Sequence, residues 1–183
     1  KFLGKILSNT HRITQMLDRL SLSVKLENND LRVKPNEFDL GGVCIDTISI
    51  LQAKYPYRTI TFNGGTKTVF ADRTMIELIV TNLVDNALAY GAPPVEVTIS
   101  EQSGEAVTDV ADRGPGVRPE DVERLKQPFT RADDSRARSD GAAGAGLGLA
   151  IVDRIARLHG GRFDLLPREG GGTIARVSLP LKG

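Results

Sequence analysis

The chain has 183 residues, of which 40% are hydrophobic, so it is long and apolar enough to bury a core. Its 24 basic and 23 acidic side chains leave a formal net charge of +1, which excludes the strong basic excess that is typical of nucleic-acid binding. The lone Cys44 excludes an internal disulfide and a thiolate metal cluster, and no apolar run approaches the ~20 residues that span a bilayer.

Residues 1–28 are predicted to form one helix. Apolar side chains follow steps of three and four residues, with one polar interruption, at Leu3, Ile6, Thr10, Ile13, Leu17, Leu20 and Val24. This spacing is close to the 3.5-residue repeat of helices that pack in bundles. Such a stripe needs a partner, either the chain's own domain or other helices, including those of a second chain. The spacing favours the bundle.

Residues 29–37 are polar and contain Pro35, which predicts a linker and places the start of a separate domain at residue 38. The expected elements of its first half are a helix over 41–52, short strands over 59–62 and 68–70 around a turn at 63–65, and a helix from the N-cap Asp72 to Tyr90. Gly91 and the prolines that follow it are typical of a helix end.

The second half of the domain is predicted to combine strands with one helix. The expected elements are strands over 95–100 and 106–111 around a turn at 103–104, a helix that follows Gly148 and ends at 159–161, and strands over 162–166 and 173–179 around the glycines at 170–172. Together the elements predict an α+β fold, a two-layer sandwich in which helices cover a mixed, mostly antiparallel sheet.

Two asparagines stand where the long helix would be expected to carry apolar residues. Asn82 and Asn86 are four residues apart, so they share one face of the helix with Met75 and Ile79. Asparagine is a poor helix former, and two on one buried edge need an explanation. They are either satisfied polar core residues or amide ligands of a hard cation such as Mg²⁺, which prefers oxygen ligands.

Two glycine-rich blocks, at 112–116 and 144–149, flank a polar stretch. Tight turns around a loose connection indicate a site that closes over a ligand, because glycine lets main-chain N–H groups approach an anion. Asp112 in the first block is either a turn aspartate or a carboxylate that accepts from an exocyclic amine such as that of adenine. The second block precedes a helix, as in phosphate-binding loops, but it is neither a Walker A loop nor a Rossmann fingerprint.

The order and spacing of these blocks resemble the ATP-binding catalytic domain of sensor histidine kinases, within the wider family that includes gyrase, Hsp90 and MutL. NLVDNALAYG (82–91) is similar to the N box, DRGPG (112–116) to the G1 box, QPF (127–129) to the F box, GAGLGLAIV (144–152) to the G2 box and GGT (171–173) to the final glycine block. QPFTRADDSR, with the later GLGLAIVDRIARLHGG, resembles the EnvZ-type subgroup most.

The resemblance implies a site for ATP and Mg²⁺. Asn86 would ligate Mg²⁺, and Asn82 would support the metal or the phosphates. Asp112 would bind the adenine amine, Tyr90 would pack on the adenine ring, and residues 117–143 would form a mobile lid. The other implied contacts come from Gly114, Gly116, Arg131, Arg136, Gly144, Gly146, Leu147, Gly148 and Thr173. The two lid arginines would either reach the phosphates or be plain solvated charges.

The chain departs from the family pattern in ways that bear on its chemistry. The gyrase and Hsp90 branch carries a glutamate base where this chain has Asn82, and asparagine cannot act as a general base, which implies phosphoryl transfer to a protein rather than rapid hydrolysis. Many relatives carry lysine or arginine at the position of Ala89. Neither His11 nor His159 stands in the acceptor pattern of histidine kinases, a histidine with an acidic neighbour and a proline further on.

We therefore expect residues 1–28 to resemble the second helix of the dimerisation hairpin, with the acceptor histidine outside this chain. The parent would be a bacterial inner-membrane sensor that dimerises and passes phosphate to a response regulator. This chain would lie in the cytoplasm, without nucleic-acid or direct membrane contact. Two alternatives stay open. An anti-sigma type serine kinase would share the pocket, although the heptad helix argues against it, and a non-enzymatic module would signal by nucleotide-dependent lid ordering.

Overall fold

The computed structural model describes residues 32–130 and 146–181, together with positions 14, 17, 20–22, 24 and 25. The described positions before residue 26 are helical. Leu17, Leu20 and Val24 of the predicted stripe are exposed, whereas the neighbouring Leu22 packs against the core of the domain. The domain thus leaves these three apolar side chains uncovered. In the part of the chain that is described, no helix has the length and apolar character to cross a membrane.

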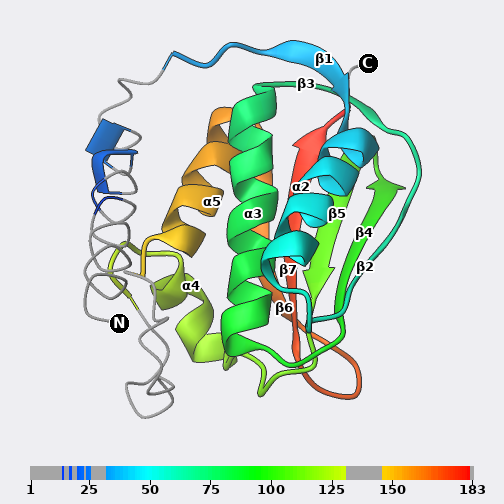
Figure 1. The fold of residues 1–183 in the computed structure, drawn as a ribbon. Helices are drawn as coiled ribbons and strands as arrows, with labels where there is room; N and C mark the ends of the chain where they lie inside the picture. Colours follow the sequence, from blue (N-terminus) through cyan, green and yellow to red (C-terminus); the bar gives the residue numbers. More distant parts are fainter. Residues whose placement is uncertain are drawn as a thin grey trace, which may run out of the picture.

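One face of a five-stranded sheet carries the main helices (Figure 1). The strands, in spatial order, are β2 (Ile60–Gly64), β4 (Val95–Gln102), β5 (Glu105–Ala111), β7 (Thr173–Pro180) and β6 (Arg162–Pro167). β2 is parallel to β4, and all the other neighbours are antiparallel. The helices are α2 (Leu40–Lys54), α3 (Arg73–Tyr90) and α5 (Gly148–Leu158). This arrangement confirms the predicted α+β sandwich with a mixed, mostly antiparallel sheet.

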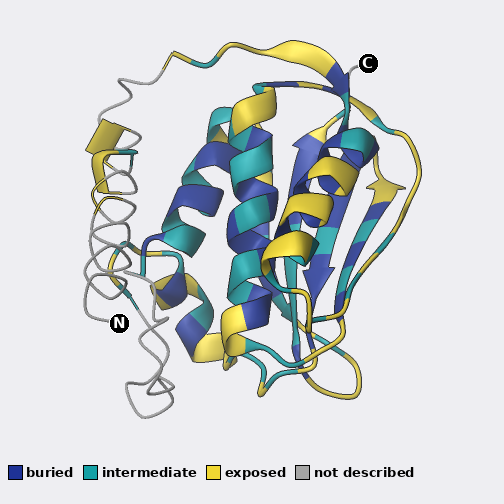
Figure 2. Ribbon diagram, in the orientation of Figure 1, coloured by how far each residue is buried: buried dark blue, intermediate teal, exposed yellow. Residues whose placement is uncertain are grey.

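The core fills the space between the helices and the sheet (Figure 2). Side chains alternate along β4, so that Val95, Val97 and Ile99 face the helices and are buried. The facing layer comes from α3 and α5, where the buried residues repeat at helical spacing: Ile76, Ile79, Val80, Leu83, Val84, Ile151, Val152 and Ile155. Side chains of opposite parity in the strands lie on the sheet face that α2, α3 and α5 do not cover.

The strands predicted over 59–62 and 68–70 are present, but they do not pair with each other around the predicted turn. Strands β2 and β3 (Thr68–Ala71) do not form a hairpin, because β2 joins the large sheet and β3 pairs with β1 (Asn36–Asp39), which begins in the predicted linker and ends beyond it. The segment between β2 and β3 explains why they separate. The Asp39 carboxylate accepts from the Lys67 N–H, and the Leu40 N–H donates to the Lys67 carbonyl. These contacts bind the segment before β3 to the start of α2 instead of to β2.

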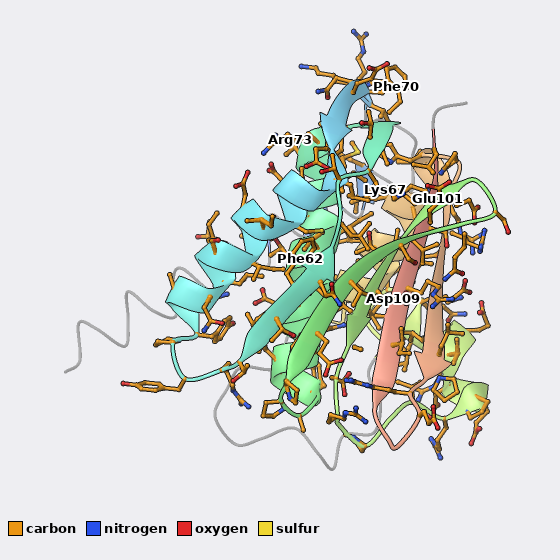
Figure 3. The ribbon with its side chains drawn as sticks, turned by 90° about the vertical axis from the view of Figure 1, so that its right-hand side faces the viewer. Phe62, Lys67, Phe70, Arg73, Glu101 and Asp109 are labelled. Carbon is orange, nitrogen blue, oxygen red and sulfur yellow. The ribbon has the colours of Figure 1, made fainter. Side chains whose placement is uncertain are left out.

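Ion pairs connect the ends of several elements at the surface. Lys67 Nζ lies 2.7 Å from Glu101 Oε2 on β4, and Arg73 Nη2 lies 3.0 Å from Asp46 Oδ2 on α2 (Figure 3). Such partly exposed pairs contribute little to stability. The start of α3 depends more on its predicted N-cap, because the Asp72 carboxylate accepts from the backbone N–H groups of Thr74 and Met75.

His159 connects the end of α5 to the start of α3. Its Nε2 accepts from the Asp72 N–H at 3.0 Å, while Nδ1 lies 2.8 Å from the Ile155 carbonyl oxygen. This geometry matches a ring in which Nδ1 donates and Nε2 accepts, because the Ile155 carbonyl oxygen can only accept and the Asp72 N–H can only donate. Both nitrogens of this helix-ending histidine are engaged within the fold.

Replacing His159 with alanine is expected to lower the free energy of unfolding by about 1–3 kcal/mol, because the Asp72 N–H loses its acceptor. Urea denaturation measures this difference. His159→Gln is the matched control, since its amide oxygen can accept the same hydrogen bond and should recover part of the loss. Alanine and glutamine variants that are both as stable as the parent would contradict this role.

Candidate functional site

The two asparagines of α3 differ in how their amides are used. Asn82 is 3% exposed, and its Nδ2 donates to the Leu78 carbonyl at 2.8 Å within the same helix. Asn86, one turn later, is half-buried, and the described residues form no hydrogen bond with its amide. Asn82 is thus partly satisfied by its own helix, whereas no described residue pairs with either polar atom of the Asn86 amide.

The N-terminus of α5 lies directly against Asn82. A Cβ atom added at Gly148, the first residue of α5, would lie 3.1 Å from Asn82 Oδ1. Leu147 before it is 1% exposed and anchors the turn, and within the described part of the chain no side chain caps the first N–H groups of α5. Uncapped N–H groups at a helix N-terminus favour an anion, because the helix dipole also points its positive end there.

Gly146 brings the two ends of the undescribed stretch 131–145 together. It has a φ of +71°, which favours glycine, and a Cβ there would lie 2.8 Å from the Thr130 carbonyl oxygen. The chain therefore leaves the described fold at Thr130 and re-enters it at the same point. Arg131, Arg136 and Gly144 of the predicted site lie outside the described residues.

The first part of the predicted lid is helical, which the sequence reasoning missed. A 3-10 turn, η1 (Pro119–Asp121), leads into the short helix α4 (Val122–Leu125). Asp121 is buried, and its two carboxylate oxygens accept from Arg118 and Arg124 on either side. The opposite charges three residues apart on each side of Asp121 were the available signal for this turn.

Asp112 is buried at the end of β5, against the C-terminal end of α3. Its side chain is enclosed by two glycines: a Cβ at Gly91 would lie 2.5 Å from Asp112 Cβ, and a Cβ at Gly114 would lie 2.7 Å from Gly91 Cα. Gly116, at a φ of +78°, turns the chain away beyond it. A side chain at Gly91 or at Gly114 would collide with Asp112 or with the backbone of Gly91. The two glycines therefore leave room for the Asp112 carboxylate.

The surroundings of the Asp112 carboxylate shift its pKa in opposite directions. Burial raises the pKa of Asp112 above its ordinary value, while the N–H groups of Gly114 and Thr173 and the charge of Arg168 act to lower it. The Gly114 N–H donates to Asp112 Oδ1 at 2.6 Å. Asp112 as a whole is 8% exposed, and these donors satisfy only part of the capacity of its carboxylate to accept hydrogen bonds.

The structure thus brings the predicted residues together in two groups along α3, one beside its middle and one at its C-terminal end. Asn82 with Leu147 and Gly148 forms one group, and Asp112 with Gly114 and Thr173 forms the other. Tyr90, at the end of α3, is half exposed. The described residues include no cluster of three or more His, Cys, Asp or Glu side chains that could hold a metal ion. A cation here would depend on amide oxygens and on the ligand.

Sequence reasoning missed Arg168 and Glu96. Arg168 donates to the Asp112 carbonyl and pairs with Glu96 on β4, although 56 residues separate it from Asp112 and 72 from Glu96. No local pattern marks either residue, since contacts at such separations follow only from the strand order of the sheet.

Comparison with known proteins gives the family. Residues 71–183 match the family described as histidine kinase-, DNA gyrase B-, and HSP90-like ATPase. The sensor protein CutS of Streptomyces coelicolor is 36% identical over 185 residues, which cover 98% of this chain and 44% of CutS. The sensor protein RstB of Escherichia coli is 33% identical over 172 residues, which cover 93% of this chain and 39% of RstB. The chain spans less than half the length of both relatives.

Solved structures agree in fold. The Acinetobacter baumannii histidine kinase AdeS superimposes with a TM-score of 0.81 and 22% identity, covering 99% of this chain and 84% of that one. The family match begins at the end of β3 and includes the asparagines of α3, Asp112 and the start of α5. The two groups of predicted residues therefore lie within the matched segment. The chain belongs to the histidine kinase-, DNA gyrase B- and HSP90-like ATPase family, and its relatives include sensor proteins and histidine protein kinases.

Proposed function

We propose that this chain is the catalytic ATP-binding part of a two-component sensor histidine kinase. The proposal is supported most by one observation: the buried carboxylate of Asp112 lies at the C-terminal end of α3, the helix that also carries Asn86, whose amide has no partner among the described residues, and that packs against α5. Within this proposal, residues 1–28 are part of the dimerisation helices, 29–37 form the linker, and 38–183 form the catalytic domain.

The adenine would bind at the Asp112 end. The carboxylate accepts a hydrogen bond from the exocyclic amine, and its charge strengthens that bond. Gly116 leaves room for the base, Tyr90 packs on the ring, and Thr173 supports the carboxylate through its backbone N–H. A buried acceptor of this kind discriminates strongly against a base without the amine, because the carboxylate would then remain unpaired.

The phosphates would bind at the other end of the site, between the middle of α3 and the start of α5. The N–H groups at the start of α5 bind phosphate oxygens, and Asn82 lies beside them. The half-buried amide oxygen of Asn86 fits a Mg²⁺ ion, which is usually held by few protein groups together with substrate phosphates. When bound, Mg²⁺ supplies neutralisation of the charge on the phosphates.

This chain would promote phosphoryl transfer by positioning ATP for the acceptor histidine, without forming a covalent bond to the phosphoryl group itself. A ring nitrogen of the acceptor histidine forms a bond to the γ-phosphorus, and the bond to the bridging oxygen breaks, leaving its electron pair on ADP. His159 is not suited as the acceptor, because both of its nitrogens are engaged within the fold. The phosphoryl group would then pass to an aspartate of a response regulator.

The parent protein would dimerise through its helices and be anchored in a bacterial inner membrane, with this part in the cytoplasm. The exposed side chains of Leu17, Leu20 and Val24 support packing against further helices. Sedimentation of a longer chain that includes the preceding helix tests this: a dimer is expected, and a monomer at all concentrations would contradict it.

The function is tested by two activities. The chain alone is expected to hydrolyse ATP slowly, because Asn82 cannot act as the base that activates water. When the preceding helix with its histidine is restored, ATP should transfer phosphate to that histidine, giving a label that is lost in acid and stable in base. Rapid hydrolysis by the chain alone that Asn82→Ala abolishes would contradict the proposal, as would a base-stable, acid-labile phosphate on His11.

The ATP affinity is expected to fall as the pH is lowered, beginning at a higher pH than the ordinary aspartate value of ~3.9 would give. Burial raises the pKa of Asp112, and only its ionised form, present above that pKa, accepts from the adenine amine. Calorimetric titrations across the acid range measure the effect. Asp112→Asn is the control for titration of the nucleotide phosphates, and an identical pH dependence in both proteins would contradict the assignment.

A further inference from the structure

The guanidinium of Arg168 is held between two acceptors, the main-chain carbonyl of Asp112 and the carboxylate of Glu96. Its Nη1 donates to the Asp112 main-chain carbonyl at 3.2 Å, and its Nη2 pairs with Glu96 Oε2 on β4. The Arg168 side chain is 10% exposed, which is unusual for an arginine unless it has a structural partner. The hydrogen bond from Arg168 also lowers the pKa of Glu96, so this partner stays charged.

Two backbone hydrogen bonds also hold the Asp112 backbone, and one of them is made by the N–H of Arg113, in the same peptide group as the Asp112 carbonyl, which donates to the Ala92 carbonyl at 2.9 Å. The Asp112 N–H donates to the Thr173 carbonyl at 3.0 Å, as part of the approach of β5 to β7. The Asp112 carbonyl receives Arg168, the one side chain that the described residues bring to it by hydrogen bond. The position of the carboxylate follows the orientation of this peptide, because only two side-chain torsions separate them. A 1 Å shift of such an acceptor is enough to weaken a specific contact strongly.

We propose that Arg168 is a positioning residue for base selectivity: by holding the Asp112 carbonyl, it aims the Asp112 carboxylate at the 6-amino group of a purine nucleotide. This inference rests on the proposed function and deepens it. The ligand class that it concerns is purine nucleoside triphosphates, with a 6-amino group favoured over a 6-oxo group.

The chain contains a matched control pair. Arg176 on β7 makes two hydrogen bonds of 2.7 Å to the carboxylate of Asp109 on β5. Asp109 and Glu96 lie on the same uncovered face of the sheet, since Asp109 pairs with Thr98, two residues along β4. Arg176 makes the same kind of ion pair as Arg168 but no hydrogen bond to Asp112. Substitution of Arg176 therefore measures how far the removal of an arginine from this face changes nucleotide binding in general.

The experiment compares calorimetric affinities for ATP and for inosine triphosphate, which carries a 6-oxo group. The proteins are the parent chain, Arg168→Met, Arg176→Met, Asp112→Ala and the double variant Arg168→Met with Asp112→Ala. We expect Arg168→Met to reduce the preference for ATP about tenfold, mainly by weakening ATP, whereas Arg176→Met leaves the preference unchanged. In the Asp112→Ala background, Arg168→Met should have no further effect on the preference.

Three outcomes overturn the inference. An unchanged preference in Arg168→Met, with Asp112→Ala impaired, would leave the proposed function intact and reject the role of Arg168. Equal losses of preference in Arg168→Met and Arg176→Met would indicate a general structural effect. Equal ATP binding by the parent and by Asp112→Ala would reject the proposed site itself. Circular dichroism and urea denaturation verify the folding of each variant, and Arg168→Lys should keep part of the preference.

Discussion

Replacing Gly172 with alanine is expected to lower the free energy of unfolding by about 3 kcal/mol or more. Gly172 has a φ of +107°, a region that side chains rarely adopt, and an added Cβ would lie 2.0 Å from the Asp112 carbonyl oxygen. Neither β5 nor the turn before β7 can move away without breaking the pairing of Ala111 with Ile174. Urea denaturation, analysed by its midpoint and slope, measures the loss.

The neighbouring Gly171 separates the two causes. It has a similar φ of +99°, but no heavy atom lies within 4 Å of an added Cβ. Gly171→Ala should therefore cost only the strain of the backbone conformation, about 1 kcal/mol. Equal destabilisation by the two substitutions would contradict the close approach of Gly172 to Asp112.

Replacing Asp112 with asparagine is expected to weaken ATP binding about 100-fold without weakening the fold. The loss corresponds to a charge-assisted hydrogen bond of ~2–3 kcal/mol to the adenine amine. The fold should be as stable as before or more so near neutral pH, because burial raises the pKa of Asp112 and the fold therefore disfavours its ionised form. Calorimetry with ATP and urea denaturation measure the two effects separately.

The control for this substitution is Asp109→Asn, which removes a carboxylate that pairs with Arg176 on the open face of the sheet. Its ATP affinity should equal that of the parent. Unchanged ATP binding in Asp112→Asn, or a loss of binding in proportion to a loss of stability in both variants, would contradict the role of Asp112 in binding adenine.

The elements that the sequence predicts well are those with local causes. Asp72 as an N-cap, the hairpin turn at Ser103 and Gly104, and the glycine turn before β7 each follow from one or two residues that favour one backbone conformation. The pairing of β1 with β3 and the parallel approach of β2 to β4 were missed. Both join segments through partners far along the chain, so strand propensity alone cannot select them.

The same division applies to the candidate site. The asparagines of α3 and the glycine blocks were recognisable because each depends on a short spacing in the sequence. The sequence could not tell that Asn82 is partly satisfied by the Leu78 carbonyl while the Asn86 amide has no partner among the described residues. Nor does the sequence reveal the hydrogen bond from Arg168 to the Asp112 carbonyl, since that contact depends on how the turn between β6 and β7 passes the end of β5.

The central claim is that this chain binds ATP with Mg²⁺ at Asn86, and one measurement tests it most directly. ATP affinity is determined by calorimetry with Mg²⁺ and with a chelator, for the parent, for Asn86→Ala and for the control Asn63→Ala, an exposed position on β2. The account predicts that Mg²⁺ strengthens ATP binding in the parent and in the control, and that Asn86→Ala loses this strengthening. An equal effect of Mg²⁺ in all three proteins, or a parent that does not bind ATP, would contradict it.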